Sequence, residues 1–218
     1  MKVMSLLLAV AGSVLFISPA VSQNQKDPKA QEILKGVSTK YKSMKSLSAS
    51  FSVITTDQKT KVNEKYTGNI TVKGEKYRLS LKGQDVISNG KSSWTYLKES
   101  NEVQINEVAE KSDAISPTNI FTIYEKGFST KYIGEKTIEN VVYQQIELVP
   151  DDAKKSYFKI QLNINKQEKI ISTAKVFEKS GNQFTYSIDK FKMNPDAPDA
   201  LFTFDTAKYP GVEIVDLR

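Results

Sequence analysis

The chain has 218 residues, with 31 Lys and Arg against 25 Asp and Glu, so its formal net charge is +6. It contains no histidine and no cysteine, which excludes disulfides, thiolate and imidazole metal sites, and Ser-His-Asp or Cys-His catalysis. Its lysines are interleaved with acidic residues, whereas a nucleic-acid binder would more often cluster them, so we expect no nucleic-acid partner.

Residues 1–22 have the pattern of a secretory signal peptide. A positive charge near the start precedes an apolar run over residues 3–17, and Ala20 and Ser22 are small residues before a cleavage site. The run is too short for a membrane-spanning helix, which needs about 20 apolar residues. We therefore expect cleavage between Ser22 and Gln23, and a periplasmic protein.

The remaining residues, 23–218, are expected to form one domain, because no linker, low-complexity tract or internal repeat divides them. Asp27 and Pro28 are typical of a helix start, with a capping carboxylate before a proline in the first turn. Apolar residues then recur at helical spacing, which predicts one amphipathic helix ending about Lys45.

From residue 47 onward the sequence predicts strands almost throughout. Apolar and polar residues alternate over residues 66–83 with a break at Gly74, which is the pattern of a hairpin with one apolar face. Asn89 and Gly90 form a strong hairpin signal. Further strands are predicted at residues 128–134, 141–149, 158–165, 170–178 and 183–193.

Two short helical elements interrupt the strands. Residues 116–126 begin with a capping serine and a proline, and they would place Ile120, Phe121 and Tyr124 on one face of a short helix. A second short element is expected to begin at residues 196–199.

The pattern as a whole indicates a mainly β protein with a few helices (α+β), with about ten or eleven antiparallel strands, the last at residues 209–217. A sheet of this size must curl or close. Two or three short helices cannot easily fill its concave side, so the chain forms either a tight sandwich or a sheet over an apolar cavity with a helical lid. The pattern alone does not choose between them.

Apolar strand positions are the candidates for lining such a cavity, and ordinary core packing is the alternative for each. The lipid-cavity candidates are Phe51, Tyr66, Ile70, Tyr77, Leu79, Trp94, Tyr96 and Phe184, and the lid candidates are Ile120, Phe121 and Tyr124.

No pair of carboxylates is singled out as a catalytic acid and base. Asp151 and Asp152 lie in a polar turn, and Asp196 and Asp199 are more typical of helix capping than of a calcium site. We expect no enzyme, no cofactor and no metal.

Several motifs carry a resemblance that covers nearly the whole of residues 23–218. They are the helix leading into LSASFSVI, the G-x-I-x-VK strand at residues 68–73, DVISNGKSSWTYL, SPTNIF, and the ending LFTFD followed by YPGVEIVDL. In this order they resemble the periplasmic outer-membrane lipoprotein carrier family, LolA.

The resemblance implies an open, incomplete β-barrel covered by helices. It also implies a carrier, acting without a cofactor, that accepts the acyl chains of lipoproteins from an inner-membrane releasing complex and delivers them to an outer-membrane acceptor. We expect the protein to act as a monomer.

One position departs from the family pattern. Family members often carry an arginine directly after the lysine of the G-x-I-x-VK strand, where it holds the lid closed, and this chain has Gly74 there. Arg78 alternates to the polar face of its strand. Three alternatives stay open: a carrier of another lipid, a sensor or interaction module of the same fold, and a structural envelope domain with a packed core.

Overall fold

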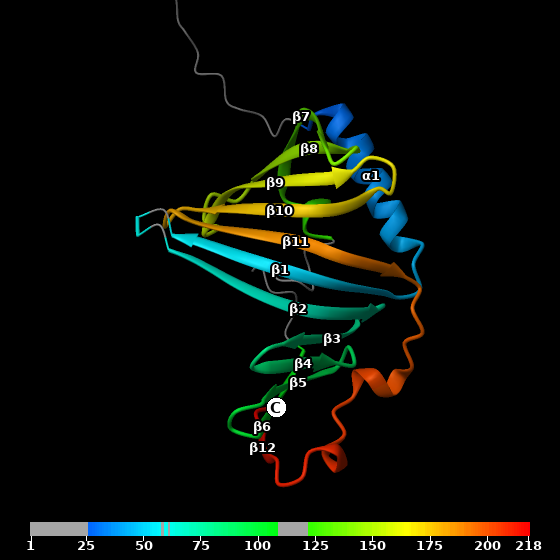
Figure 1. Ribbon diagram of the computed structural model, residues 1–218, viewed down its shortest axis with the longest axis vertical. Coiled ribbons are helices and arrows are strands. Elements are labelled where there is room, and N and C mark those ends of the chain that lie inside the picture. Colours follow the sequence, from blue (N-terminus) through cyan, green and yellow to red (C-terminus); the bar gives the residue numbers. More distant parts are fainter. Residues whose placement is uncertain (1–25, 58, 61, 109–121) are drawn as a thin grey trace, which may run out of the picture.

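The computed structural model describes residues 26–57, 59, 60, 62–108 and 122–218, and in them one curved sheet of 12 strands dominates (Figure 1). Its strands lie in the order β12-β6-β5-β4-β3-β2-β1-β11-β10-β9-β8-β7. Their bounds are β1 (Leu47–Asp57), β2 (Asn63–Lys73), β3 (Lys76–Leu81), β4 (Gln84–Ser88), β5 (Ser92–Leu97), β6 (Glu102–Glu107), β7 (Phe128–Ile138), β8 (Val141–Pro150), β9 (Tyr157–Asn165), β10 (Ile170–Glu178), β11 (Asn182–Met193) and β12 (Glu213–Asp216).

The sheet does not close, since β7 and β12 stand at its two ends, and this confirms the expected open, incomplete barrel. Pairing is antiparallel except between β12 and β6, which run parallel, so the expectation of an entirely antiparallel sheet is wrong at the C-terminus. The sheet has 12 strands, more than the ten or eleven expected from the sequence. The additional strand is β6, in which apolar and polar residues alternate over only Val103 and Ile105, too short a run to predict a strand. The expected hairpins β2-β3, β4-β5, β7-β8 and β10-β11 are all present.

The single α-helix among the described residues, α1 (Pro28–Lys42), starts where the sequence indicates and ends slightly before Lys45. The Asp27 carboxylate caps it by accepting hydrogen bonds from the backbone N–H groups of Lys29 (2.8 Å) and Ala30 (3.2 Å). The same carboxylate accepts from the N–H of Tyr132 on β7 at 3.0 Å, and that bond is the main reason why its pKa is lowered. One side chain therefore both starts the helix and ties it to the sheet.

Three short 3₁₀ helices complete the fold: η1 (Ile123–Glu125), η2 (Asp199–Phe202) and η3 (Thr206–Lys208). The first lies within residues 116–126, where a short helix is expected, and residues 116–121 of that range are outside the described residues. The second confirms a short element after residue 196. No helix in the described part of the chain is long and apolar enough to cross a membrane.

The two faces of the sheet differ in polarity. We call the side that α1 covers the inner face and the other side the outer face. Across the middle of the sheet, register places an apolar row on the inner face: Val53, Tyr186, Ala174, Leu162 and Ile146. The neighbouring row on the outer face is polar: Thr67, Ser52, Ser187, Thr173, Asn163 and Gln145.

The helix α1 buries its apolar stripe against β7–β11, in the largest cluster of the core. Ala30, Leu34, Val37 and Tyr41 are its buried residues, and they join inner-face side chains such as Leu162, which is fully buried. Burial of the Tyr41 phenol raises its pKa, and its oxygen accepts a hydrogen bond from the N–H of Ile171 at 3.3 Å.

At the β4–β6 end, buried apolar side chains lie on the outer face of the sheet instead of the inner face. Ile87 and Val103 lie on the outer face and are buried, and the C-terminal segment after β11 covers them with Phe204. The ring of Phe204 stacks on that of Tyr209 with centroids 4.5 Å apart. The molecule thus has two covers, α1 and the C-terminal segment, on opposite faces of one sheet.

Candidate functional site

A second apolar cluster lies on the inner face over β1–β4, next to the part that α1 covers, and Val72, Ile188 and Phe191 pack against both clusters. Its buried centre consists of Ala49, Phe51, Ile70 and Leu79, and we call it the inner cluster. Partly buried side chains surround it, and none comes from α1: Val53, Val72, Tyr77, Leu81, Val86, Ile188 and Phe191.

A glycine makes the inner cluster possible. A Cβ atom at Gly68 would lie 2.7 Å from the Phe51 ring, 2.7 Å from a Leu81 methyl and 2.8 Å from the carbonyl oxygen of Ser80. The tip of the Phe51 ring therefore reaches the backbone of β2 at Gly68, where only glycine leaves room.

Five of the cavity candidates lie on the inner face within the two apolar clusters. Phe51, Ile70 and Leu79 form the centre of the inner cluster, and Tyr77 packs at its border. Phe184 packs against the cluster under α1.

Tyr66 is also on the inner face, paired with Val53, but it is 54% exposed. Its hydroxyl bonds to the Glu64 carboxylate at 2.5 Å, and this bond raises the pKa of the phenol. It stands at the rim of the surface.

Trp94 and Tyr96 are on the opposite face from the other six candidates. Register pairs Trp94 with Ile87, and the Tyr96 ring lies 4.5 Å from that of Tyr209 and 5.6 Å from that of Phe204. The C-terminal segment covers them, so they share no surface with the inner cluster.

Of the lid candidates, Tyr124 is described, whereas Ile120 and Phe121 lie outside the described residues. Tyr124 is buried in the cluster under α1, and burial raises its pKa to about 12. The Ser38 hydroxyl lies 3.4 Å from the Tyr124 hydroxyl and donates to Glu125 at 2.8 Å. Lys42 forms an ion pair with the same Glu125, so η1 is tied to α1.

Gly74, the position of the family's arginine, has φ +60° in the two-residue turn between β2 and β3. A residue with positive φ at the first position of such a turn is typically glycine. The flanking Lys73 and Lys76 hold Asp199 of the C-terminal segment, at 2.9 and 3.0 Å. Arg78 faces the outer side and pairs with Asp85 at 3.1 Å. This turn therefore contacts the C-terminal cover.

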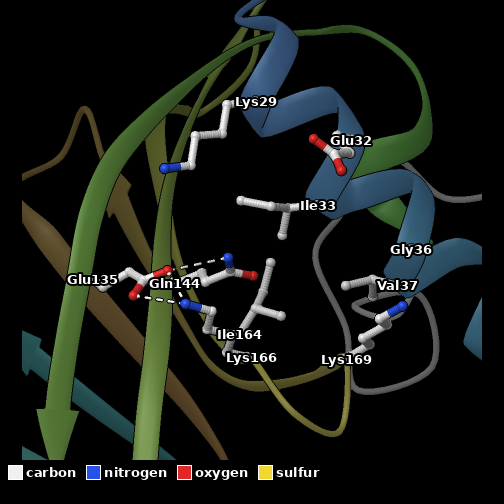
Figure 2. A pocket seen from close by; sticks show the side chains of 10 residues that line it. All are labelled: Lys29, Glu32, Ile33, Gly36, Val37, Glu135, Gln144, Ile164, Lys166 and Lys169. Carbon is white, nitrogen blue, oxygen red and sulfur yellow. Dashed lines mark hydrogen bonds and ion pairs between the residues drawn. The ribbon is translucent and has the colours of Figure 1, made fainter.

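A cleft of about 390 Å³ opens between α1, strands β7–β9 and the turn after β9 (Figure 2). Its residues are Lys29, Glu32, Ile33, Gly36, Val37, Glu135, Gln144, Ile164, Lys166 and Lys169. None of them is among the cavity or lid candidates. The signal that could have drawn attention to it is Gly36, a glycine inside a strong helical pattern.

The two surfaces differ in the side chains that they offer to a ligand. The inner cluster offers apolar side chains, and the cleft offers lysines, carboxylates and an apolar floor. Within the described ranges, no three acidic side chains gather closely enough to hold a metal ion.

Comparison with solved structures supports the fold. An uncharacterized conserved protein from Thermus thermophilus aligns with a TM-score of 0.59 and 14% identity, over 86% of this chain and 99% of that one. A LolA superfamily protein from Nitrosomonas europaea (TM-score 0.44, 14% identity, 80% and 97% covered) and the Mycobacterium tuberculosis lipoprotein LppX (0.49, 12%, 79% and 100%) are more distant.

Sequence comparison identifies the family. No curated protein matches the chain. The family described as outer membrane lipoprotein carrier protein LolA matches residues 42–205, about three quarters of the sequence. This match takes in β1–β11 and η2, and therefore both the inner cluster and the sheet strands that line the cleft. The chain belongs to the LolA family of outer membrane lipoprotein carrier proteins.

Proposed function

We propose that the protein is a non-enzymatic periplasmic carrier, which binds acyl chains of lipoproteins on the inner face of the sheet and moves them from the inner to the outer membrane. Its donor would be an inner-membrane releasing complex and its recipient an outer-membrane acceptor. Family membership supports the carrier class. The observation on which the proposal rests most is the inner cluster, an apolar surface to which α1 contributes no residue.

The energetics of acyl binding suit such a surface. Each methylene removed from water contributes about 0.8 kcal/mol, so a single acyl chain gains several kcal/mol where it lies against the inner cluster, whose centre of Phe51, Ile70 and Leu79 is buried. Partly exposed side chains around them provide contact area without tight complementarity. A carrier needs this combination, because its cargo must prefer the surface to water and the acceptor to the surface.

The decisive variant is Leu79→Glu. Leu79 is 8% exposed, so a glutamate there would place a carboxylate in an apolar surface, where an unpaired charge is strongly unfavourable. We expect loss of binding of a fluorescent acyl probe, which a triacylated lipopeptide should displace from the unaltered protein. Thr67→Glu is the matched control, because Thr67 is exposed on the outer face of β2.

Circular dichroism must accompany both titrations. A folded Leu79→Glu protein that binds the probe as the unaltered protein does would contradict the proposal. So would an unaltered protein that binds neither probe nor lipopeptide, and the packed structural domain would then be the better interpretation.

Export is the second part of the proposal, and residues 1–22 lie outside the described residues. The exported protein is expected to begin at Gln23 and to fractionate with the periplasm. N-terminal sequencing and cell fractionation measure this directly. An intact N-terminus, or retention in washed membranes, would contradict it.

A further inference from the structure

The cleft beside α1 combines an apolar floor with a charged rim. Ile33 and Val37 of α1 and Ile164 of β9 form the floor, and all three belong to or pack against the cluster under the helix (Figure 2). The rim consists of flexible charged side chains from α1, from β7 and from the turn between β9 and β10. The cleft therefore places apolar and charged side chains next to each other, which suits a ligand that has both an apolar tail and a charged group.

Two of the charged side chains on the rim neutralise each other. The Lys166 ammonium lies 2.9 Å from one Glu135 oxygen and 3.0 Å from the other. This pairing lowers the pKa of Glu135 and raises that of Lys166, so both stay charged at neutral pH. Gln144 also approaches Glu135, at 3.4 Å. Glu135 is therefore not available to a ligand cation.

The other rim charges leave an excess of one positive charge. Lys29 and Lys169 form no ion pair with any described carboxylate, and Glu32 forms none with any described lysine. The Lys29 ammonium lies over the Tyr132 ring, 3.9 Å from its centroid, and its charge contributes to the lowered pKa values of Glu135 and Asp27 without an ion pair to either. An anionic group is therefore the ligand that the rim favours.

Gly36 is an independent indication that the cleft is kept open. A glycine inside a helix destabilises it by about 1 kcal/mol relative to alanine, yet the Cβ of an alanine at 36 would meet only the Lys169 stem, at 3.5 Å. No close packing explains the glycine. A longer side chain, however, would enter the cleft and displace Lys169.

The position of Lys169 is itself fixed by the backbone. It has φ +57°, unusual for a residue with a side chain, and its N–H bonds to the carbonyl oxygen of Asn165 at 2.8 Å. The tight turn after β9 thus holds the lysine opposite Gly36.

We propose that this cleft binds the anionic headgroup of an amphiphilic lipid, with its phosphate or carboxylate between Lys29 and Lys169 and the start of its tail on Ile33, Val37 and Ile164. The inference rests on the proposed carrier function and adds anionic lipids to the acyl compounds that the protein binds.

The test compares two lysolipids with the same acyl chain, lysophosphatidylglycerol (net charge −1) and lysophosphatidylcholine (net charge zero), both below their micelle concentrations. Solvent-exposed charge contacts are each worth up to about 1 kcal/mol, so lysophosphatidylglycerol should bind about five-fold more tightly at low salt. The preference should shrink as salt is added. Glycerol phosphate, which has the headgroup without the tail, should bind much more weakly.

Lysine variants test whether the cleft causes the preference for lysophosphatidylglycerol over lysophosphatidylcholine. Lys29→Gln and Lys169→Gln should each reduce the ratio of the two affinities toward one, because they weaken lysophosphatidylglycerol more than lysophosphatidylcholine, whose choline ammonium already offsets its phosphate. The matched control is Lys190→Gln, because Lys190 is exposed on the outer face of β11.

A pair of variants at Gly36 separates binding from folding. Gly36→Ala should raise the melting temperature and retain lysophosphatidylglycerol binding, because its Cβ makes only an ordinary contact. Gly36→Leu should also keep the helix but lose the preference, since its side chain occupies the cleft. The two variants would then share a stable helix and differ in whether they prefer lysophosphatidylglycerol.

Equal affinity for the two lysolipids in the unaltered protein would overturn the inference and leave the carrier function intact. Unchanged preference in both lysine variants would do the same, as would glycerol phosphate binding as tightly as lysophosphatidylglycerol, which would indicate a site for free phosphate. Failure to bind either lysolipid or a neutral acyl probe would overturn the carrier function itself.

Discussion

Each end of the sheet has apolar side chains that another segment of the chain covers, and the covered face differs between the two ends. At the β7–β11 end, α1 covers apolar side chains on the inner face, and the outer face is polar. At the β4–β6 end, the C-terminal segment covers Ile87 and Val103 on the outer face. Between them lies the inner cluster, which receives no residue from α1. A continuous sheet can thus carry two covers on opposite faces, with a third apolar cluster, itself buried, between the two covered parts.

The largest effect is expected from Leu162→Ala, under α1. Leu162 is fully buried between Ile146 and Ala174, so the truncation should lower the free energy of unfolding by about 2–5 kcal/mol. Urea denaturation followed by circular dichroism measures this. A loss below about 1 kcal/mol would mean that the helix can readjust over the sheet.

Phe204→Ala tests the other cover. Removing a ring that stacks on Tyr209 and packs on Ile87 should destabilise the C-terminal segment by about 3 kcal/mol. We expect faster amide hydrogen exchange in β12 and β6, with β9 and β10 unchanged. Equal acceleration in all four strands would show that the two ends unfold as one unit.

Asp85→Ala tests the polar side of the same outer face. Asp85 is buried, bonds to Arg78 at 3.1 Å and forms an ion pair with Lys98 at 2.8 Å, although that approach makes no hydrogen bond. Its removal leaves two half-buried cations without an anion. We expect unfolding free energy to fall by about 1–3 kcal/mol, measured in urea.

Gly74→Ala concerns the turn that contacts the C-terminal cover. An alanine forced to φ +60° should destabilise the protein by about 1–2 kcal/mol, although open space surrounds the position. Gly83→Ala is the control, because Gly83 also has open space around it but no positive φ. Equal melting temperatures for the two variants would contradict this account. The family's arginine at 74 would meet the same strain.

The smallest effect is expected at Asp199, an exposed carboxylate held by Lys73 and Lys76. The hydrogen bond from Lys73, then that from Lys76, lowers its pKa in the folded state, so its contribution to stability is present above the unfolded pKa. That contribution is lost as the pH falls through the lower, folded pKa, which places the loss below about pH 4. The melting temperature of Asp199→Asn should be slightly lower at pH 6 and equal at pH 2. A difference that persists at pH 2 would mean that charge is not the cause.

The alternation of apolar and polar residues along a strand determines how much of the fold could be predicted from the sequence. The period of two located most strands and showed that each has one apolar face, which is why Phe51, Ile70 and Leu79 were grouped correctly on one surface. Alternation does not say which face of the sheet that is. Trp94 and Tyr96 alternate just as well but belong to the outer face, because the segment that covers them is about a hundred residues away in sequence.

The cleft was not predictable by the same reasoning. Its residues come from α1, from the middle of β7 and β8, and from the turn after β9, and no local pattern joins these segments. Lys29 and Lys169 look like any other surface lysines in sequence. Only the helix glycine at 36 was a local signal, and its meaning depends on the side chain opposite.

The position of β1 in the middle of the sheet has a consequence for how fast the protein can fold. β2–β6 and β7–β11 can each assemble from neighbouring hairpins, but β1 must pair with β11, which closes the loop between Asp57 and Asn182. The entropy of closing a loop grows only slowly with its length, so the equilibrium penalty is modest. The rate suffers more, because pairing between distant segments is slow. Until β11 is available, β1 has an unpaired edge, and a newly synthesised chain is at its most aggregation-prone during that interval.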